Sequence, residues 1–382
     1  MSLTEAALGL SWVTAAAGRP ALGLLERWGV QAVWRAGASE LRRWSDSGSW
    51  VLAFLERRSQ FVPAEARAAL RASGLRFVPY GDGGYPAVLR HLPWPPAGLY
   101  VRAEPEAYET FLHAPRVTIV GTRAPTAYGR ALALSFGEAF AQAGVVVVSG
   151  MALGIDSEAH RGCLSQGGLT VAVLGCGADR PYPRRHRDLH RRIAGNGALI
   201  SELPPGWPPA PWTFPLRNRL LAALGDGVVV VEAGARSGAL STADWALDLG
   251  KQVFVVPGPI NGPTFLGSTK LLHQGAACCL GPAETVEDFF AMTRTERYGR
   301  GGDGPLEGVT GRPRKDGPAR SAGDLGPAAR LSLLALARGA QTVDEVAAAT
   351  GLAVGDTAAA LALLELQGLA VRAGPGRYGL VS

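Results

Sequence analysis

The repeated alternation of short apolar runs with glycine-containing turns constrains this chain of 382 residues more than any other feature. The apolar runs occupy residues 117–120, 145–148, 170–174 and 228–231. Each run is rich in β-branched residues, as expected for strands that are buried on both faces. Amphipathic helix candidates such as residues 128–143 alternate with them. The pattern predicts an α/β fold with a doubly wound, mainly parallel sheet.

The turns that follow these strands predict a site for an anion. In a doubly wound sheet, ligands bind outside the carboxyl ends of the strands. Backbone N–H groups at glycine-rich turns and helix N-termini suit phosphate. Neither the turn at 121–123 nor the loop at 149–156 is a GxGxxG block or a P-loop, so dinucleotide and triphosphate binding are not supported. The candidate phosphate contacts are Gly121, Thr122, Arg123, Ser149, Gly150, Ser237 and Gly238.

The hexapeptide 214–219 adds an aromatic side chain to these candidates. Its contacts would be Phe214, Arg217, Asn218 and Arg219. Aromatic rings interleaved with arginines suit single-stranded nucleic acid, because rings stack on bases while cations follow the phosphates. The alternative is a salt-bridged helix start. Further point charges could come from Lys251 and Lys270, whereas the arginine run 180–192 is interpreted mainly as a solvated helix face.

Composition excludes several classes of protein but does not identify a ligand. Hydrophobic residues make up 47% of the chain, yet no apolar run approaches the ~20 residues of a membrane span. The first residues lack a basic secretory start, so a cytoplasmic location is expected. The net charge of +6 is spread over nearly balanced segments and does not demonstrate nucleic-acid binding. The four cysteines lack zinc spacing and are predicted to be buried free thiols, with no metal site.

Four segments are predicted along the chain. Residues 1–72 form short helices, residues 73–290 the sheet domain with its core at 113–290, and residues 291–326 a flexible linker. In residues 327–382, three helices and a hairpin are typical of a winged helix. The candidate recognition helix, 354–367, contains no Lys or Arg. We therefore expect protein interaction or weak duplex binding from that domain.

The sequence offers two pairs of residues that could form a catalytic site. An enzyme would need a nucleophile with a base, or paired carboxylates. Asp156 with His160, or Glu202 with Glu232, could be assembled into such a site. Each of these residues also has a plain structural explanation, and the sequence predicts a protein that is not an enzyme.

Ordered blocks over roughly residues 76–282 resemble the DNA-processing protein A (DprA/Smf) family. The resemblance is specific because so many blocks occur in the same order. The blocks are Gly121-Thr122-Arg123, Ser149-Gly150-x-Ala152-x-Gly154-Ile155-Asp156, Val173-Leu174-Gly175-x-Gly177-x-Asp179-x3-Pro183, Ser201-Glu202-x-Pro204-x-Gly206, Phe214-Pro215-x-Arg217-Asn218-Arg219, Glu232-Ala233-x3-Ser237-Gly238-x3-Thr242-Ala243 and Val256-Pro257-Gly258.

The resemblance implies an extended Rossmann-like domain, flanked by an N-terminal helical (SAM-like) domain and a C-terminal winged-helix-like domain. It further implies a homodimer that binds single-stranded DNA without a cofactor. Such proteins interact with the RecA recombinase, help to load it onto DNA coated by single-strand-binding protein, and protect incoming DNA during natural transformation. By the same resemblance, Arg123 would contact a phosphate and Phe214 a base.

The chain departs from the family in the residues before Phe214, where Pro211-Trp212-Thr213 stands in place of frequent basic residues. Stacking would then replace charge at that position. Two alternative functions stay open. A phosphoribohydrolase on the same fold would need a Pro-Gly-Gly-x-Gly-Thr-x-x-Glu block, but residues 232–238 read differently. A winged-helix regulator would instead bind duplex DNA.

Overall fold

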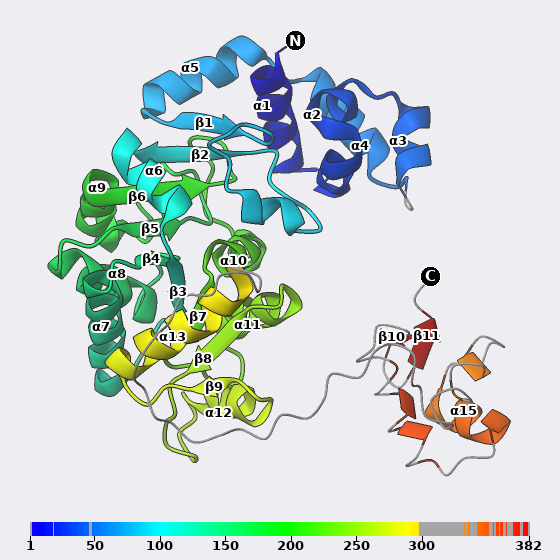
Figure 1. Ribbon diagram of the computed structural model, residues 1–382. Coiled ribbons are helices and arrows are strands. Elements are labelled where there is room, and N and C mark those ends of the chain that lie inside the picture. Colours follow the sequence, from blue (N-terminus) through cyan, green and yellow to red (C-terminus); the bar gives the residue numbers. More distant parts are fainter. Residues whose placement is uncertain are drawn as a thin grey trace, which may run out of the picture. The chain divides into compact units, whose positions relative to one another are not determined.

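The computed structural model describes residues 2–17, 19–45, 48–297, 332, 335–336, 342–350, 354, 357–358, 360–361, 364, 370–374 and 377–380. The chain divides into two compact units, Met1–Gly302 and Asp303–Ser382. In the first unit, coloured blue to yellow in Figure 1, helices surround a sheet. None of the helices in the described ranges combines the length and the apolar character needed to span a bilayer.

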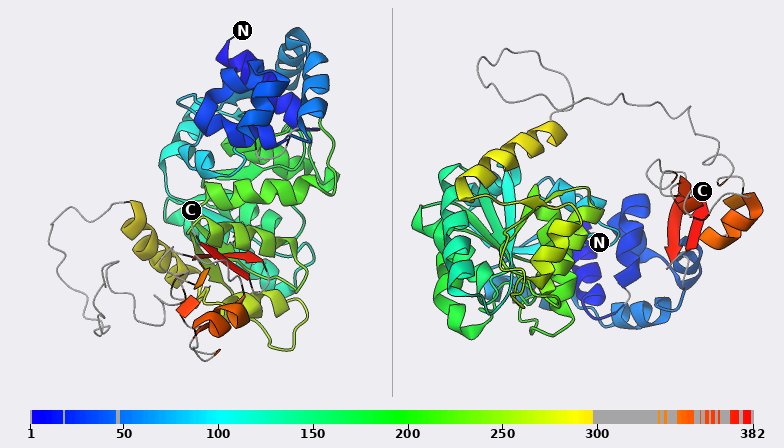
Figure 2. Two further views of the ribbon diagram at one scale, coloured as in Figure 1. Left: turned by 90° about the vertical axis from the view of Figure 1, so that its right-hand side faces the viewer. Right: turned by 90° about the horizontal axis from the view of Figure 1, so that it is seen from below.

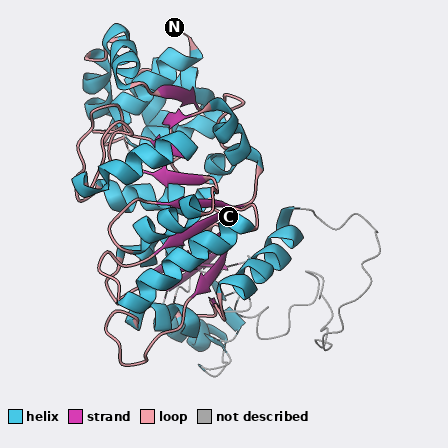
Figure 3. Ribbon diagram, turned by 90° about the vertical axis from the view of Figure 1, so that its left-hand side faces the viewer, coloured by secondary structure: helices cyan, strands magenta, loops and turns pink. Residues whose placement is uncertain are grey.

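A nine-stranded sheet runs the length of the first unit in the order β1-β2-β6-β5-β4-β3-β7-β8-β9 (Figure 3). Neighbouring strands are parallel from β6 to β9, whereas β2 is antiparallel to both β1 and β6. The predicted doubly wound, mainly parallel sheet is confirmed. Strands β1 to β9 are Arg76–Pro79, Gly98–Ala103, Arg116–Val120, Val146–Ser149, Thr170–Val173, Gly197–Ser201, Gly227–Val230, Gln252–Val255 and Ala277–Cys278.

The order of the strands reverses beside β3. The chain runs outward from β3 through β4 and β5 to β6, then returns to place β7 on the opposite side of β3. The segments that leave β3 and β7 therefore diverge, and they open a crevice at the carboxyl ends of these two strands.

Helices cover both faces of the sheet because alternate residues of each central strand are buried on opposite sides (Figure 2). Val117 and Ile119 of β3 pack with Phe136 of α7, whereas Val120 belongs to the core that contains Leu220 of α10. The helices of the sheet region are α6 Pro105–His113, α7 Ala127–Gln142, α8 Ile155–Ser165, η3 Arg184–His186, α9 Arg187–Asn196, α10 Thr213–Leu224, α11 Gly238–Asp248, α12 Leu266–His273 and α13 Pro282–Arg297.

The N-terminal residues form the predicted set of short helices around their own core. Gly29, at φ 74°, interrupts α2, as expected for a glycine between two helical stretches. Helix α1 also packs on the sheet, because Leu8 shares a core with Tyr100 of β2. This region therefore belongs to the same compact unit as the sheet. Its elements are α1 Leu3–Thr14, η1 Arg19–Leu24, α2 Leu25–Arg35, α3 Ala38–Trp44, α4 Val51–Ser59 and α5 Pro63–Ser73.

Strand β2 lies between β1 and β6, and the segment after Tyr85 forms the 3-10 helix η2, Ala87–His91. Two expectations from the sequence differ from the structure. Helix α13 continues to Arg297, beyond residue 290, where the sequence placed the start of the linker. Residues 298–326 of that predicted linker lie outside the described residues. Three cysteines are buried as predicted, but Cys278 is exposed on the edge strand β9.

The second unit contains the predicted hairpin, in which β10 (Ala370–Gly374) is antiparallel to β11 (Arg377–Leu380). Helix α15, Val343–Thr350, begins with a capping box. Thr342 N donates to Glu345 Oε2 and Glu345 N donates to Thr342 Oγ1, each over 3.2 Å. The predicted helices 328–338 and 354–367 fall largely outside the described residues.

Candidate nucleic-acid interface

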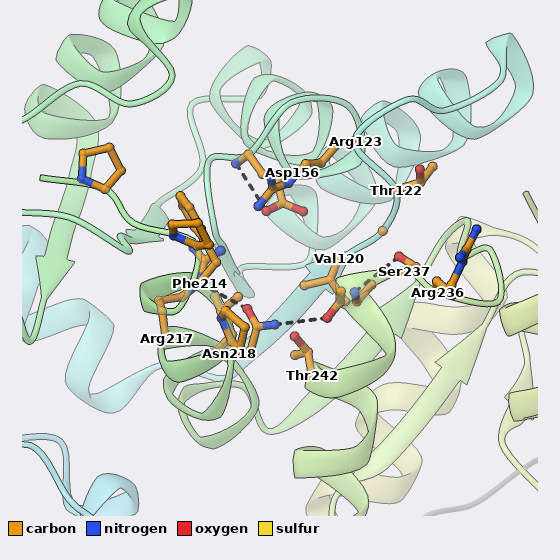
Figure 4. A pocket seen from close by; sticks show the side chains of 18 of the residues that line it. Val120, Thr122, Arg123, Asp156, Phe214, Arg217, Asn218, Arg236, Ser237 and Thr242 are labelled. Carbon is orange, nitrogen blue, oxygen red and sulfur yellow. Dashed lines mark hydrogen bonds between the residues drawn. The ribbon is translucent and has the colours of Figure 1, made fainter. Parts of the chain in front are cut away.

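A pocket of about 640 Å³ lies at the crevice between the ends of β3 and β7. Five segments meet there: the turn after β3, the start of α8, the segment with Tyr182 after β5, the start of α10 with the loop before it, and the loop that leads into α11. Figure 4 shows Phe214 and Arg217 on one side of the pocket and Arg236 with Ser237 on the other. Of the predicted contacts, the structure brings together Gly121, Thr122, Arg123, Phe214, Arg217, Asn218, Ser237 and Gly238 around this pocket.

The turn after β3 depends on glycine. A Cβ on Gly121 would lie 2.5 Å from Ile155 Cγ1 and 2.9 Å from the carbonyl oxygen of Glu232. Only a residue without a side chain therefore lets β3 pass so close to α8. The turn is pinned because Thr122 N donates to Glu232 O over 2.7 Å. That N–H group is committed inside the protein, so it is not one of the phosphate donors that the sequence predicted.

Arg123 and Phe214 meet at the mouth of the pocket. The Arg123 side chain is exposed, and its guanidinium carbon lies 4.9 Å from the centre of the Phe214 ring. Phe214 is half-buried, and its ring also packs against Tyr182, with 5.6 Å between the ring centres. A cation and two aromatic rings thus share one rim. They also border an adjoining hollow of about 50 Å³.

Arg217 forms the floor of the pocket and does not project from it. Its side chain is only 4% exposed, and Nη1 donates to the carbonyl oxygens of Gly150, over 2.9 Å, and Val173. A Cβ on Gly150 would lie 2.2 Å from Arg217 Nη1, so a larger residue there would displace the guanidinium. Burial lowers the pKa of Arg217, whereas the charge of Asp156 raises it. The guanidinium therefore braces the ends of β4 and β5 from within.

Asp156 is the buried counter-charge of Arg217. Burial raises the pKa of Asp156, and the Arg217 guanidinium opposes that shift. Asp156 lies inside the first turn of α8 and does not cap it, because Gly154 is the N-cap. The Asp156 carboxylate instead accepts from Ala152 N over 3.3 Å. It thereby closes the loop before α8 and offsets the charge beneath the pocket.

The start of α11 forms the opposite wall. Ser237 caps this helix by accepting from Ala239 N, and Asn218 Nδ2 donates to Gly238 O over 3.0 Å. The positive end of the helix dipole faces the pocket at this point. Arg236 is exposed and lines the same wall, so the pocket carries a second outward-facing cation.

Five predicted contacts do not line this pocket, and one of them, Gly150, borders the adjoining hollow. Arg219 is 1% exposed, and its two Nη atoms each donate over 2.7 Å to the carboxylate of Glu202. Ser149 is fully buried and donates to Ile119 O over 2.6 Å. Lys251 directly precedes β8, at the amino end of that strand and away from the pocket. Its Nζ donates to Ala223 O and Gly225 O. Lys270 is exposed on α12 and does not line the pocket.

The groups that could have formed a hydrolytic site are engaged in structural contacts. Glu232 is buried and accepts from Thr126 N and from Thr126 Oγ1, at the start of α7. His160 is fully buried, its Nδ1 lies 2.7 Å from Thr170 Oγ1, and burial lowers its pKa to about 3. Among the described residues, no group of three or more acidic, histidine or cysteine side chains could hold a metal ion.

Two pocket residues were missed from the sequence. Tyr182 is separated from Phe214 along the chain, so its ring contact was not visible in any local pattern. Arg236 lies in the block 232–238, from which the sequence predicted only Ser237 and Gly238 as contacts. The arginines of the run 180–192 are exposed while Leu189 and Ile193 are buried, as predicted for a solvated face of α9.

Comparisons with known proteins agree on one family. The family model for DNA recombination-mediator protein A matches residues 76–290, and the model for the DprA winged helix domain matches residues 316–376. A putative DNA processing protein DprA of Mycobacterium tuberculosis is 44% identical over 259 residues, which are 67% of this chain and 62% of that relative. Protein Smf of Synechocystis is 34% identical over 316 residues, or 79% of each chain.

Solved structures give the same answer. The X-ray structure of DNA processing protein A from Streptococcus pneumoniae matches with a TM-score of 0.65 and 27% identity, and the match covers 76% of this chain and 99% of that chain. The corresponding protein from Helicobacter pylori matches with a TM-score of 0.51 and 29% identity, over 58% of this chain and 98% of that chain. With the sheet, the N-terminal helices and the winged-helix match, these findings establish that the chain belongs to the DNA recombination-mediator protein A (DprA/Smf) family, whose members act in DNA processing and recombination.

Proposed function

We propose that this protein binds single-stranded DNA at the β3–β7 pocket and delivers it to a RecA-type recombinase. The observation that carries the proposal is the shared rim, where the exposed Arg123 guanidinium and the Phe214–Tyr182 ring pair lie side by side. A single strand offers both groups that such a rim recognises: a phosphate for the cation and an unpaired base for the rings.

The rest of the pocket supports binding without a chemical step. Arg236 and the start of α11 add positive potential on the wall opposite Phe214. The buried charges of Arg217 and Asp156 face each other and hold the loops in place. A preformed site of this kind loses little conformational entropy when a strand binds.

The relatives support the same reading. The Helicobacter pylori structure is described as showing a single-stranded DNA binding mode of DNA processing protein A. We extend that property to this chain because the fold is shared. Recombinase loading, displacement of single-strand-binding protein and protection of incoming DNA during natural transformation in the cytoplasm complete the proposal. They follow from the role of the family as recombination mediators.

Homodimerisation is part of the proposal. A monomer would leave two apolar side chains in water: Leu280, two residues after the edge strand β9, is 81% exposed, and Ile260, in the loop after β8, is 75% exposed. Apolar surface of this kind at the edge of a sheet favours association with another copy. Two copies would hold one strand more tightly without any new contact to DNA.

Competition binding tests the proposal. We expect labelled oligo-dT to be displaced by unlabelled oligo-dT far more readily than by a duplex of equal length. Preference for duplex would favour a winged-helix regulator instead. Release of free base from nucleoside monophosphates would favour a phosphoribohydrolase. The recombinase step is tested separately, by RecA filament formation on oligo-dT coated with single-strand-binding protein, with and without this protein.

A further inference from the structure

An exposed indole lies just outside the pocket. Trp212 is 44% exposed and directly follows Pro211, which lines the pocket, while Phe214 lies two residues further along. Consecutive Cα atoms are about 3.8 Å apart, so Trp212 is within one nucleotide of the pocket mouth. It is the N-cap residue of α10 but makes no side-chain capping bond.

A cation from the N-terminal helices lies on this indole. The guanidinium carbon of Arg19, in η1, is 5.3 Å from the centre of the Trp212 ring. Burial lowers the pKa of Arg19, while the charge of Glu202 raises it and that of Arg219 lowers it again. Arg19 therefore lies near the buried Glu202–Arg219 ion pair, and its contact with Trp212 places the N-terminal region beside the pocket.

The backbone of a second tryptophan with an exposed side chain contacts the same ion pair. Trp94 is 42% exposed, and its carbonyl oxygen accepts from Arg219 Nη2 over 3.0 Å. Its side chain lies against η1, because a Cβ on Gly23 would be 3.5 Å from Trp94 Cδ1. Two indoles and one arginine thus gather where η1 meets the sheet region. We call Arg19, Trp94 and Trp212 the outer ledge.

We propose that single-stranded DNA leaving the pocket continues over the outer ledge, so that the N-terminal helical region forms part of the DNA-binding surface. A base stacks on the face of Trp212 that Arg19 leaves open, and the guanidinium attracts the adjoining phosphate. The alternation of rings and cation is the pattern that holds single strands regardless of sequence. The inference rests on the proposed function, because the pocket supplies the strand that the ledge extends.

Oligonucleotides of two lengths distinguish DNA binding at the outer ledge from DNA binding at the pocket. Single-strand sites span about 4 to about 16 nucleotides, so oligo-dT of these two lengths fills the pocket alone or the pocket with the ledge. We expect Trp212→Ala to weaken binding of the longer oligonucleotide by about 5- to about 150-fold, the equivalent of one stacked base. Binding of the shorter one should change little, and Trp212→Phe should restore most of the loss.

Arg19→Ala should weaken binding of the longer oligonucleotide and lower the slope of log affinity against log salt by about 0.7, the value for one phosphate contact. Arg19→Lys should keep that slope but lose affinity, because an ammonium does not lie flat on a ring. Arg27→Ala is the matched control. Arg27 lies 5.1 Å from the Trp28 ring in the same helical region but lines no part of the pocket.

The outcomes distinguish the two proposals. If the unmodified protein binds neither oligonucleotide, the proposed function fails. If it binds both and Arg123→Ala weakens both, but Trp212→Ala and Arg19→Ala leave both unchanged, then only the ledge is overturned. Equal losses at both lengths, or an equal loss in Arg27→Ala, would also overturn the ledge. Thermal unfolding of each variant confirms that the compared proteins are folded.

Discussion

The contact between Arg123 and Phe214 gives the sharpest quantitative prediction. With 4.9 Å between the guanidinium carbon and the ring centre, the two side chains form a cation–π pair at an exposed rim. Such a pair is worth ~0.5–1 kcal/mol. Replacing Phe214 by Ala removes a stacking surface worth ~1–3 kcal/mol per base, without removing a charge. Replacing Arg123 by Ala removes one phosphate contact and lowers the single-strand salt slope by about 0.7.

A double-mutant cycle isolates the pair. Because each single substitution already loses this contact within the protein, the two single losses of unfolding free energy, measured by chemical denaturation, should sum to ~0.5–1 kcal/mol more than the loss in Arg123→Ala/Phe214→Ala. DNA binding by the same variants is assayed separately, by fluorescence anisotropy with labelled oligo-dT over a series of salt concentrations. Phe214→Leu serves as the control, since it keeps an apolar side chain at the rim but has no aromatic face.

Two results would refute this reasoning. Independent sites are additive within ~0.3–0.5 kcal/mol, so additive losses would show that ring and cation do not act together. A salt slope that is unchanged in Arg123→Ala would show that no phosphate is bound there. Affinity retained in Phe214→Leu would show that the ring fills space and does not stack on a base.

Further predictions concern the buried charges and the sheet edge. Arg219→Ala should destabilise the protein by ~3–5 kcal/mol in chemical denaturation, because it leaves the buried carboxylate of Glu202 without its counter-charge. The salt slope of DNA binding by the folded fraction, measured by anisotropy, should stay unchanged. The pKa of His160 is lowered from 6.5 to about 3, so the unfolded chain binds a proton that the folded chain excludes. Stability from this site should therefore be lost as the pH falls from 6.5 towards 3, by up to about 5 kcal/mol, and urea titrations across that range should show a shallower fall in His160→Asn. Leu280→Glu should shift the protein from dimer to monomer in sedimentation velocity, and an unchanged dimer would exclude the β9 edge as the interface.

The sheet could be predicted from the sequence because its signal is local. The run 117–120 became β3, Arg116–Val120, since four consecutive β-branched and mostly apolar residues are typical of a strand between two covered faces. The glycines in the turns after the strands could also be predicted, because their signal is local too. Gly121 and Gly150 follow apolar runs, and both are sites of close approach in the structure. The position of the pocket then followed from the rule for doubly wound sheets.

The roles of the arginines could not be predicted in this way. Arg217 and Arg219 appear in the sequence as two cations beside an aromatic residue, and their burial depends on Asp156 and Glu202 in other segments. A signal was present in residues 220–224, which are apolar throughout. A helix that is apolar on every side is buried, so the polar residues just before this stretch are drawn inward with it.

Burial divides the cations of the site into two groups with different roles. Arg217 and Arg219 each face a buried carboxylate, so they fix the loops around the pocket and contribute little net potential at its mouth. Arg123 and Arg236 are exposed on the pocket walls, where a phosphate can reach them. A site with so few outward-facing cations cannot depend on charge alone, because each single-strand phosphate contact contributes only about 0.7 to the salt slope. The small net charge of +6 is therefore compatible with nucleic-acid binding, and discrimination against duplex DNA must come from the rings, which need an unpaired base.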